Sequence, residues 1–178
     1  MRIVAPNASS RLIGKGAPLI SRALGAWFAQ ASQNMVRRRM NVLDSLSLVR
    51  RFLEAENARD WHAWSSYLHP TVTYATVGST TVIEGREEYV ANMQRIYTEL
   101  PDWTFRLVHI FGDEEAVIVE FDGSGHFSGT YKSVRYVRAP LRLSAVCIFD
   151  LSDGLILSVR EYFDHVGYEH QLQLASRR

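Results

Sequence analysis

The chain has 178 residues, of which 47% are hydrophobic and 11% aromatic, and its formal net charge is +1. This length and composition suit one globular domain with a sizeable core and exclude an intrinsically disordered chain. No apolar run reaches the roughly 20 residues that span a bilayer. The single cysteine, Cys147, excludes an internal disulfide framework and a cysteine-rich zinc site.

The start of the chain differs from the rest in charge, because residues 1–43 carry seven Lys and Arg residues and no Asp or Glu. Three interpretations stay open. This character is typical of an organelle transit peptide, but a misassigned start before Met35 or Met40, or a basic arm for nucleic acid or membrane, would look the same. We expect a basic extension over residues 1–41 and a folded domain over residues 42–176. The expected location is the cytoplasm, or an organelle matrix if the extension is a transit peptide.

The domain begins with a pattern that predicts helices. Residues 44–60 offer Asp44 as an N-cap and carry an apolar stripe at helical spacing, formed by Leu46, Val49, Phe52 and Leu53. A second short helix begins after the N-cap Asp60 and ends before Pro70.

Strand patterns dominate the rest. Residues 71–76 alternate in a β-branched and aromatic run that indicates a strand, and residues 85–100 form a third helix. A hairpin turn is predicted at Ser152-Asp153-Gly154, because an Asp-Gly pair tolerates positive φ. Helices followed by antiparallel strands predict an α+β fold. The long strands are expected over residues 103–111, 116–127, 136–151 and 156–164.

Several motifs in this order resemble the nuclear transport factor 2-like superfamily and, within it, the SnoaL-like polyketide cyclases. The resemblance implies a conical α+β barrel, in which a strongly bent, mostly antiparallel sheet wraps over three N-terminal helices around an internal pocket. It also implies a homodimer, but not one reaction, because the fold hosts isomerases, dehydratases, epoxide hydrolases, cyclases and binding domains. The motifs span about residues 44–174 and read "FLEAENARDWHAWSSYLHPTVTY", "IEGREEYVANM", "GSGHFSG", "DLSDGLILSVREYFD" and "HQLQL".

Two members of the superfamily match this sequence poorly. Scytalone dehydratase uses two histidines, which His109 and His126 match loosely, while its aspartate and tyrosine positions hold Asn57 and Glu56. A pair of imidazoles is still suited to acid/base chemistry near neutral pH. Ketosteroid isomerase chemistry is excluded, because its proton-transferring positions are held by Phe52, Ala75 and Val146.

The site of limonene epoxide hydrolase is retained in part. Tyr74 matches its tyrosine, Thr76 replaces its asparagine, and Glu161 replaces the aspartate of its last strand. Its arginine position falls on Phe121 or Glu120, so the bridging cation is missing. Epoxide hydrolysis is therefore a weakened alternative.

The SnoaL-like cyclases place a catalytic aspartate near the end of the last strand, before a short helix, and Asp164 followed by Gln171-Leu172 fits that pattern. In those enzymes the residue is the acid/base group of an aldol ring closure that needs no cofactor. Strand alternation puts Glu161 on one face with Val159 and Phe163, and Asp164 on the other. A bulge or the strand end would change this, so which carboxylate faces the pocket stays open.

A second polar face follows residues 116–127, where Glu120, Asp122 and His126 share one side by period 2. That side is either the wet inside or the wet outside of the cone. The glycines of "GSGHFSG" leave room for a ligand beside His126. His109 is either a pocket residue or a core histidine.

We expect a cofactor-independent enzyme that performs proton-transfer chemistry on a small apolar oxygenated substrate, such as a polyketide or terpenoid. The alternatives are a non-catalytic ligand-binding or dimerisation module and an epoxide hydrolase. No metal is expected, because His165 and His170 lack the spacing of a helical metal site. Neither nucleic acid nor membrane is an expected partner. The expected catalytic residues are Asp164, Glu161, His126 and His109, and the expected substrate-binding residues are Tyr74, Thr76, Asp122, Glu120 and Phe163.

Overall fold

The structure of the protein is a computed structural model, which describes residues 42–176. The basic segment over residues 1–41 lies outside the described residues, so the interpretations of that segment and the domain boundaries stay predictions. Within residues 42–176, no helix has the length and hydropathy needed to cross a membrane.

Three helices precede the long strands in the described part of the chain, and a fourth follows them. The first covers residues 42–58, so Asp44 lies inside it and the predicted N-cap there is wrong. Asp60 does cap the next helix, because its carboxylate accepts a 3.0 Å hydrogen bond from the Ala63 backbone N–H. The other helices are α2 (Trp61–Ser66), α3 (Arg86–Glu99) and α4 (His165–Ala175).

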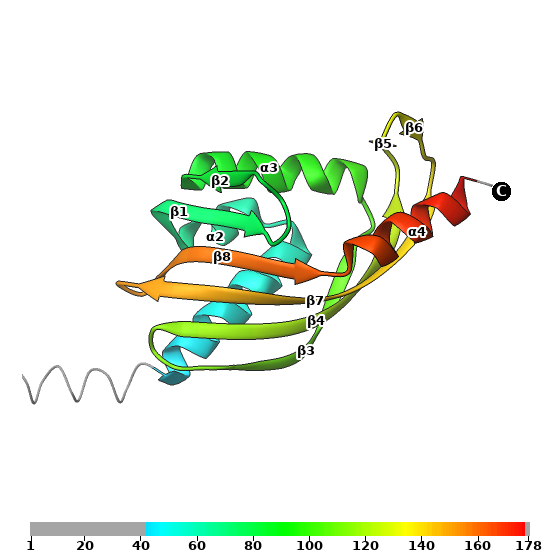
Figure 1. The fold of residues 1–178 in the computed structure, drawn as a ribbon. Coiled ribbons are helices and arrows are strands. Elements are labelled where there is room, and N and C mark those ends of the chain that lie inside the picture. The colour runs from blue at the N-terminus through cyan, green and yellow to red at the C-terminus, as the bar shows by residue number, and fades with distance from the viewer. Residues whose placement is uncertain (1–41, 177–178) are drawn as a thin grey trace, which may run out of the picture. The chain divides into compact units, whose positions relative to one another are not determined.

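Six strands form one bent sheet in the order β2-β1-β8-β7-β4-β3 (Figure 1). Strands β1 and β8 run parallel, and every other neighbouring pair is antiparallel. The α+β class is thus confirmed, with a curled sheet whose edges β2 and β3 do not pair with each other. The strands are β1 (Leu68–Thr76), β2 (Val82–Glu84), β3 (Thr104–Gly112), β4 (Ala116–Phe127), β7 (Ala139–Ser152) and β8 (Leu155–Phe163).

Two features complete the fold. The predicted hairpin turn joins β7 to β8, where Asp153 and Gly154 have φ values of 52° and 75°. A small ribbon of β5 (Thr130–Tyr131) and β6 (Val134–Arg135) lies near α4 at one end of the sheet (Figure 1).

The hydrophobic core lies between the helix over residues 42–58 and one face of the sheet. Phe52 stacks on Trp64 of α2 with ring centroids 4.8 Å apart, and its ring meets Phe149 of β7 edge-on at 5.7 Å. Val49 and Trp64 are completely buried. This packing decides which face of the sheet is dry: the face that carries Phe149 covers the helix, and we call it the inner face.

Candidate active site

A cavity of about 260 Å³ lies over the inner face of the sheet. A smaller space of about 50 Å³ shares six of its lining residues and extends the site toward Phe149. Larger grooves occur on the surface, but they are lined mainly by exposed residues, one by residues of β3, β4 and β7 and the other by residues 135–142 and α4. We regard the inner cavity with this extension as the candidate site, because buried carboxyl groups line it and do not line the two surface grooves. Its polar lining consists of Glu56, Tyr74, Thr76, Glu99, Tyr97, Glu161 and Tyr168.

Glu161 of β8 faces this cavity, together with Phe163 of the same strand. Parallel pairing of β1 with β8 places Thr76 opposite Glu161. The Tyr74 hydroxyl donates a 2.6 Å hydrogen bond to Glu161 Oε2 and lies 3.1 Å from Thr76 Oγ1. Burial raises the pKa of Glu161 above its usual value, although the hydrogen bond from Tyr74 acts in the opposite direction.

Glu56, on the first helix, is a second carboxyl of the cavity wall and was not among the predicted site residues. Its residue surface is 9% exposed. Tyr97 of α3 donates a 2.7 Å hydrogen bond to Oε1, and the Trp64 indole N–H donates one of 3.3 Å to Oε2. Burial raises the pKa of Glu56 to about 7, against the lowering effect of these two donors.

The sequence does contain a signal for Glu56. It follows Val49, Phe52 and Leu53 at spacings of seven, four and three residues, so helical periodicity places it on their buried stripe. An acid on a buried stripe is exceptional, because carboxyls are almost never fully buried without partners.

Arg59 helps to hold Tyr97, one of the two hydrogen-bond donors of Glu56. Its guanidinium carbon lies 3.7 Å from the centroid of the Tyr97 ring. One guanidinium nitrogen also donates a 2.8 Å hydrogen bond to the backbone oxygen of Glu56. The cation thus contacts the tyrosine ring and the main chain, while no salt bridge joins it to the Glu56 carboxylate within the described residues.

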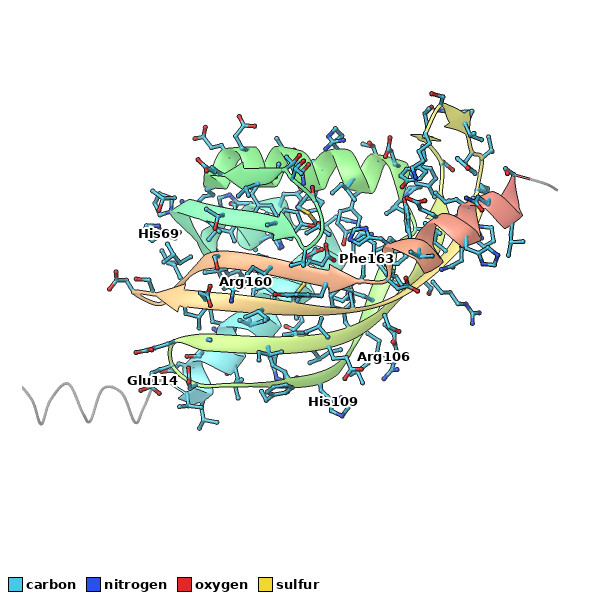
Figure 2. All side chains as sticks on the ribbon, in the orientation of Figure 1. His69, Arg106, His109, Glu114, Arg160 and Phe163 are labelled. Atoms are coloured by element: carbon cyan, nitrogen blue, oxygen red, sulfur yellow. The ribbon has the colours of Figure 1, made fainter. Side chains whose placement is uncertain are left out.

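The outer face of the sheet carries several predicted site residues. His109 Nδ1 lies 2.8 Å from Glu120 Oε2, with the two side chains 69% and 46% exposed. Arg106 pairs with Asp122 at 2.9 Å. Figure 2 shows His109 and Arg106 projecting outward from β3. The expected position of His109, Glu120 and Asp122 in the cavity is therefore corrected: β4 turns its apolar alternate residues inward, so these polar side chains lie outside.

His126 also lies on the outer face, with its Nδ1 at 2.8 Å from Asp102 Oδ2. The glycines beside it do not leave room for a ligand. A Cβ atom on Gly123 would lie 2.2 Å from the Trp103 ring, and one on Gly125 would lie 2.8 Å from the Trp103 backbone. The absence of a side chain at these two glycines instead makes room for Trp103.

Asp164 lies at the end of β8 and is exposed. It is the N-cap of α4, because its Oδ1 accepts a 2.9 Å hydrogen bond from the Gly167 backbone N–H. Of the two competing carboxylates, the structure thus brings Glu161 to the cavity and Asp164 to a helix terminus. Phe163 lies in the cavity wall, at the junction of β8 and α4 (Figure 2), and its role in substrate binding stays a prediction.

The electrostatic character of the cavity is acidic and aromatic. None of the described residues that line it is Lys, Arg or His. Among residues 42–176, no group of three or more His, Cys, Asp or Glu side chains is arranged to hold a metal ion. Its apolar lining includes Trp103, Phe105, Phe121, Phe127 and Phe163.

Comparison with solved structures identifies the same architecture in other proteins. A protein assigned as a SnoaL-like polyketide cyclase from Jannaschia sp. CCS1 superposes with a TM-score of 0.68 at 18% identity, over 78% of this chain and 95% of that one. One assigned as a polyketide cyclase from Xanthomonas campestris pv. campestris gives 0.65 at 23% identity, over 74% and 98%. An LEH-like epoxide hydrolase from M. tuberculosis gives 0.62 at 19% identity, over 75% and 92%. At these identities the likeness shows the fold alone.

Sequence comparison identifies the protein family of this chain. No protein in a search of curated sequences matches this chain. The family model of the SnoaL-like domain, however, matches residues 49–159, which is more than half of the chain and contains both β1 and most of β8. The chain therefore belongs to the SnoaL-like domain family.

Proposed function

We propose that the protein is a cofactor-independent enzyme that catalyses proton transfer in a small, neutral, apolar oxygenated substrate, through a cyclisation, isomerisation or dehydration. One observation carries this proposal. The Glu161 carboxylate faces a cavity walled by aromatic side chains and is oriented there by the Tyr74 hydroxyl at 2.6 Å. A carboxylate removed from water is a stronger base than one in solution, and general acid–base groups are typically tuned in this way.

Glu161 is the base of the proposed reaction. Its carboxylate takes a proton from a carbon next to a carbonyl group, and the electron pair of the broken C–H bond moves toward the carbonyl oxygen. The Tyr74 hydroxyl is engaged with Glu161 and with Thr76. Its role is therefore to fix the carboxylate, rather than to bind the substrate as the sequence predicts.

The lining of the cavity supports the substrate class. Its volume of about 260 Å³ is below the range of roughly 300–1,000 Å³ of sites for drug-sized ligands, which favours a small substrate. The lining carboxyls and the lack of a lining cation disfavour an anionic substrate. Aromatic walls favour an apolar carbon skeleton.

A probe for base catalysis tests this function without knowledge of the natural substrate. In 5-nitrobenzisoxazole, removal of the ring C–H proton breaks the N–O bond and releases a coloured phenolate. We expect wild type to accelerate this elimination, and Glu161→Gln to lower the rate by roughly 100-fold or more, as for loss of a general base. Glu120→Gln, on the outer face, is the matched control and should leave the rate unchanged. Equal rates for wild type and Glu161→Gln would instead favour a non-catalytic ligand-binding module.

Epoxide hydrolysis is a second candidate, favoured by the meeting of Tyr74, Thr76 and Glu161 in one hydrogen-bonded group. Two hydroxyls and a carboxylate can position and deprotonate a water molecule. Phe121 lines the cavity at a position predicted for the bridging arginine, which weakens this candidate. Hydrolysis of styrene oxide that is lost in Glu161→Gln, without any elimination of the benzisoxazole, would favour it over the first proposal.

The homodimer implied by the resemblance remains a proposal as well. Sedimentation of the full-length chain tests it directly.

A further inference from the structure

Glu56 is a buried ionisable group that the proposed function leaves without a role. It reaches the cavity from the first helix, whereas Glu161 reaches it from the sheet. Both carboxyls line the main cavity and also the smaller space below it. The substrate would therefore lie between two carboxyl groups that come from different walls.

We propose that Glu56 is a second catalytic carboxyl, which donates a proton to the substrate oxygen while Glu161 removes a proton from the neighbouring carbon. This inference rests on the proposed function and completes it, because the histidines expected to supply the acid lie on the outer face. Of the described residues that line the cavity, no other is a buried carboxylic acid on the wall opposite Glu161, since Glu99 belongs to the end of α3.

Burial favours the acid form of Glu56, against the opposing effect of its hydrogen-bond donors. Both of its oxygens receive hydrogen bonds from neutral donors, Tyr97 and Trp64, rather than from a cation. Two carboxylates facing one apolar cavity also repel each other, so the site favours a state with a single negative charge. The ionisable groups that act on Glu56 or are influenced by it are Glu161, Arg59, Tyr97, Tyr89 and Cys147.

The division of roles between the two carboxyls follows from their burial, because Glu56 is buried whereas Glu161 is only half-buried. Glu161 accepts a 2.6 Å hydrogen bond from a hydroxyl that has a further partner in Thr76, which stabilises its charged form. Glu56 has a pKa raised by burial to about 7, so a large fraction of it is protonated at neutral pH. An acid with a pKa near the working pH transfers its proton efficiently.

The proposed step balances for a β,γ-unsaturated ketone such as 3-cyclohexen-1-one. Glu161 takes the proton from the carbon between the carbonyl and the alkene, and Glu56 gives its proton to the carbonyl oxygen, which yields a neutral dienol. Glu161 then returns its proton to the far carbon of the former alkene, while Glu56 recovers its proton from the oxygen. The product is the conjugated enone, and both carboxyls return to their initial states.

Two probe reactions separate this inference from the proposed function. Elimination of 5-nitrobenzisoxazole needs the base, whereas isomerisation of 3-cyclohexen-1-one needs the base and an acid at the oxygen. We expect Glu161→Gln to lower both rates by roughly 100-fold or more. We expect Glu56→Gln to lower the isomerisation rate by a similar factor and the elimination rate by less than about tenfold. Glu120→Gln should leave both unchanged, and circular dichroism of each variant monitors the fold.

A measurement on the wild-type protein tests the same inference even if the variants do not fold. Isomerisation should decline as the pH rises through about 7, where Glu56 loses its proton. The elimination should show no such decline, because an ionised Glu161 is all that it requires.

Each outcome decides between the two proposals. Isomerisation that survives in Glu56→Gln, or wild type that catalyses only the elimination, overturns the role of Glu56 and leaves the function of Glu161 standing. Equal rates of both reactions in wild type and Glu161→Gln overturn the proposed function itself. An isomerisation rate in wild type that does not decline above pH 7 also contradicts an acid role for Glu56.

Discussion

The two faces of the sheet carry the same kinds of side chain in opposite electrostatic settings. On the outer face, Glu120 and Asp122 pair with His109 and Arg106 in contact with solvent. On the inner side, Glu56 and Glu161 are held by tyrosine hydroxyls and an indole. Water and a cation stabilise a carboxylate outside, while burial favours the carboxylic acid inside, against the weaker opposing effect of the neutral donors.

The pKa shifts follow this division. Hydrogen bonds from the side chain and backbone of His126 hold the pKa of Asp102 below its usual value on the outer face. Burial raises the pKa of both inner carboxyls. A pKa shift that favours the neutral form of a carboxyl group inside a cavity is characteristic of groups that exchange protons with a ligand. Paired carboxylates on the surface mainly contribute solubility.

The largest expected effect that separates the two faces is the pH dependence of stability. Because the pKa of Glu56 rises from 4.5 to about 7 on folding, the folded state retains a proton that the unfolded state loses between these values. Wild type should therefore lose stability as the pH rises from 4.5 to 7, by up to about 3 kcal/mol from this group.

Glu56→Gln lacks this ionisation, so its free energy of unfolding relative to wild type should increase across that pH range. Urea unfolding at several pH values measures the difference. The same comparison for Glu120→Gln should show no comparable increase. A difference between wild type and Glu56→Gln that does not change with pH would mean that Glu56 is ionised in the folded protein.

Removal of the Tyr74 hydroxyl should have the next largest effect. Tyr74→Phe deletes the hydrogen bond to Glu161, and a hydrogen bond to a charged group is typically worth about 1.5–3 kcal/mol. Without this bond the carboxylate is no longer held in place, so we expect the elimination rate at neutral pH to fall by about 10- to 100-fold through lost positioning. The acid limb of its pH profile should move to higher pH, because the pKa of Glu161 rises further.

Tyr162→Phe is the matched control on the same strand, since Tyr162 is 40% exposed and does not line the cavity. A rate in Tyr74→Phe equal to that of this control would show that Glu161 needs no support from Tyr74.

Asp164 should influence stability but not the probe reactions. Asp164→Ala removes the N-cap of α4 and should lower the free energy of unfolding by about 1 kcal/mol. Asp164→Asn keeps an acceptor for the Gly167 N–H and should recover most of that loss. Loss of the elimination rate in Asp164→Asn, with the fold intact, would show that Asp164 takes part in catalysis.

The smallest effect is expected from the outer pair of His109 and Glu120. Both side chains are largely exposed, so His109→Ala should change the free energy of unfolding by about 0.5 kcal/mol or less, and by still less in high salt. Rates of both probe reactions should equal those of wild type. A large loss of rate in this variant would contradict the assignment of the outer face to solvent.

Much of the architecture could be predicted from local pattern alone. The Asp153-Gly154 turn and the Asp60 cap are determined by residues close in the sequence. Alternation along β8 was also sufficient to place Glu161 and Phe163 on one face. The helical stripe of Val49, Phe52 and Leu53 contains equivalent information for Glu56, because its periodicity extends to that residue.

The tertiary structure decided which of these faces is dry. The polar face of β4 obeys period 2, yet the pattern does not say whether the cavity lies on the side of Glu120 or on that of Phe121. That choice depends on the packing of the first helix against the sheet, and the contact of Tyr74 with Glu161 depends on pairing between strands 87 residues apart in the chain. Periodicity is local and determines which side chains share a face, whereas burial and pKa depend on what distant segments bring against that face.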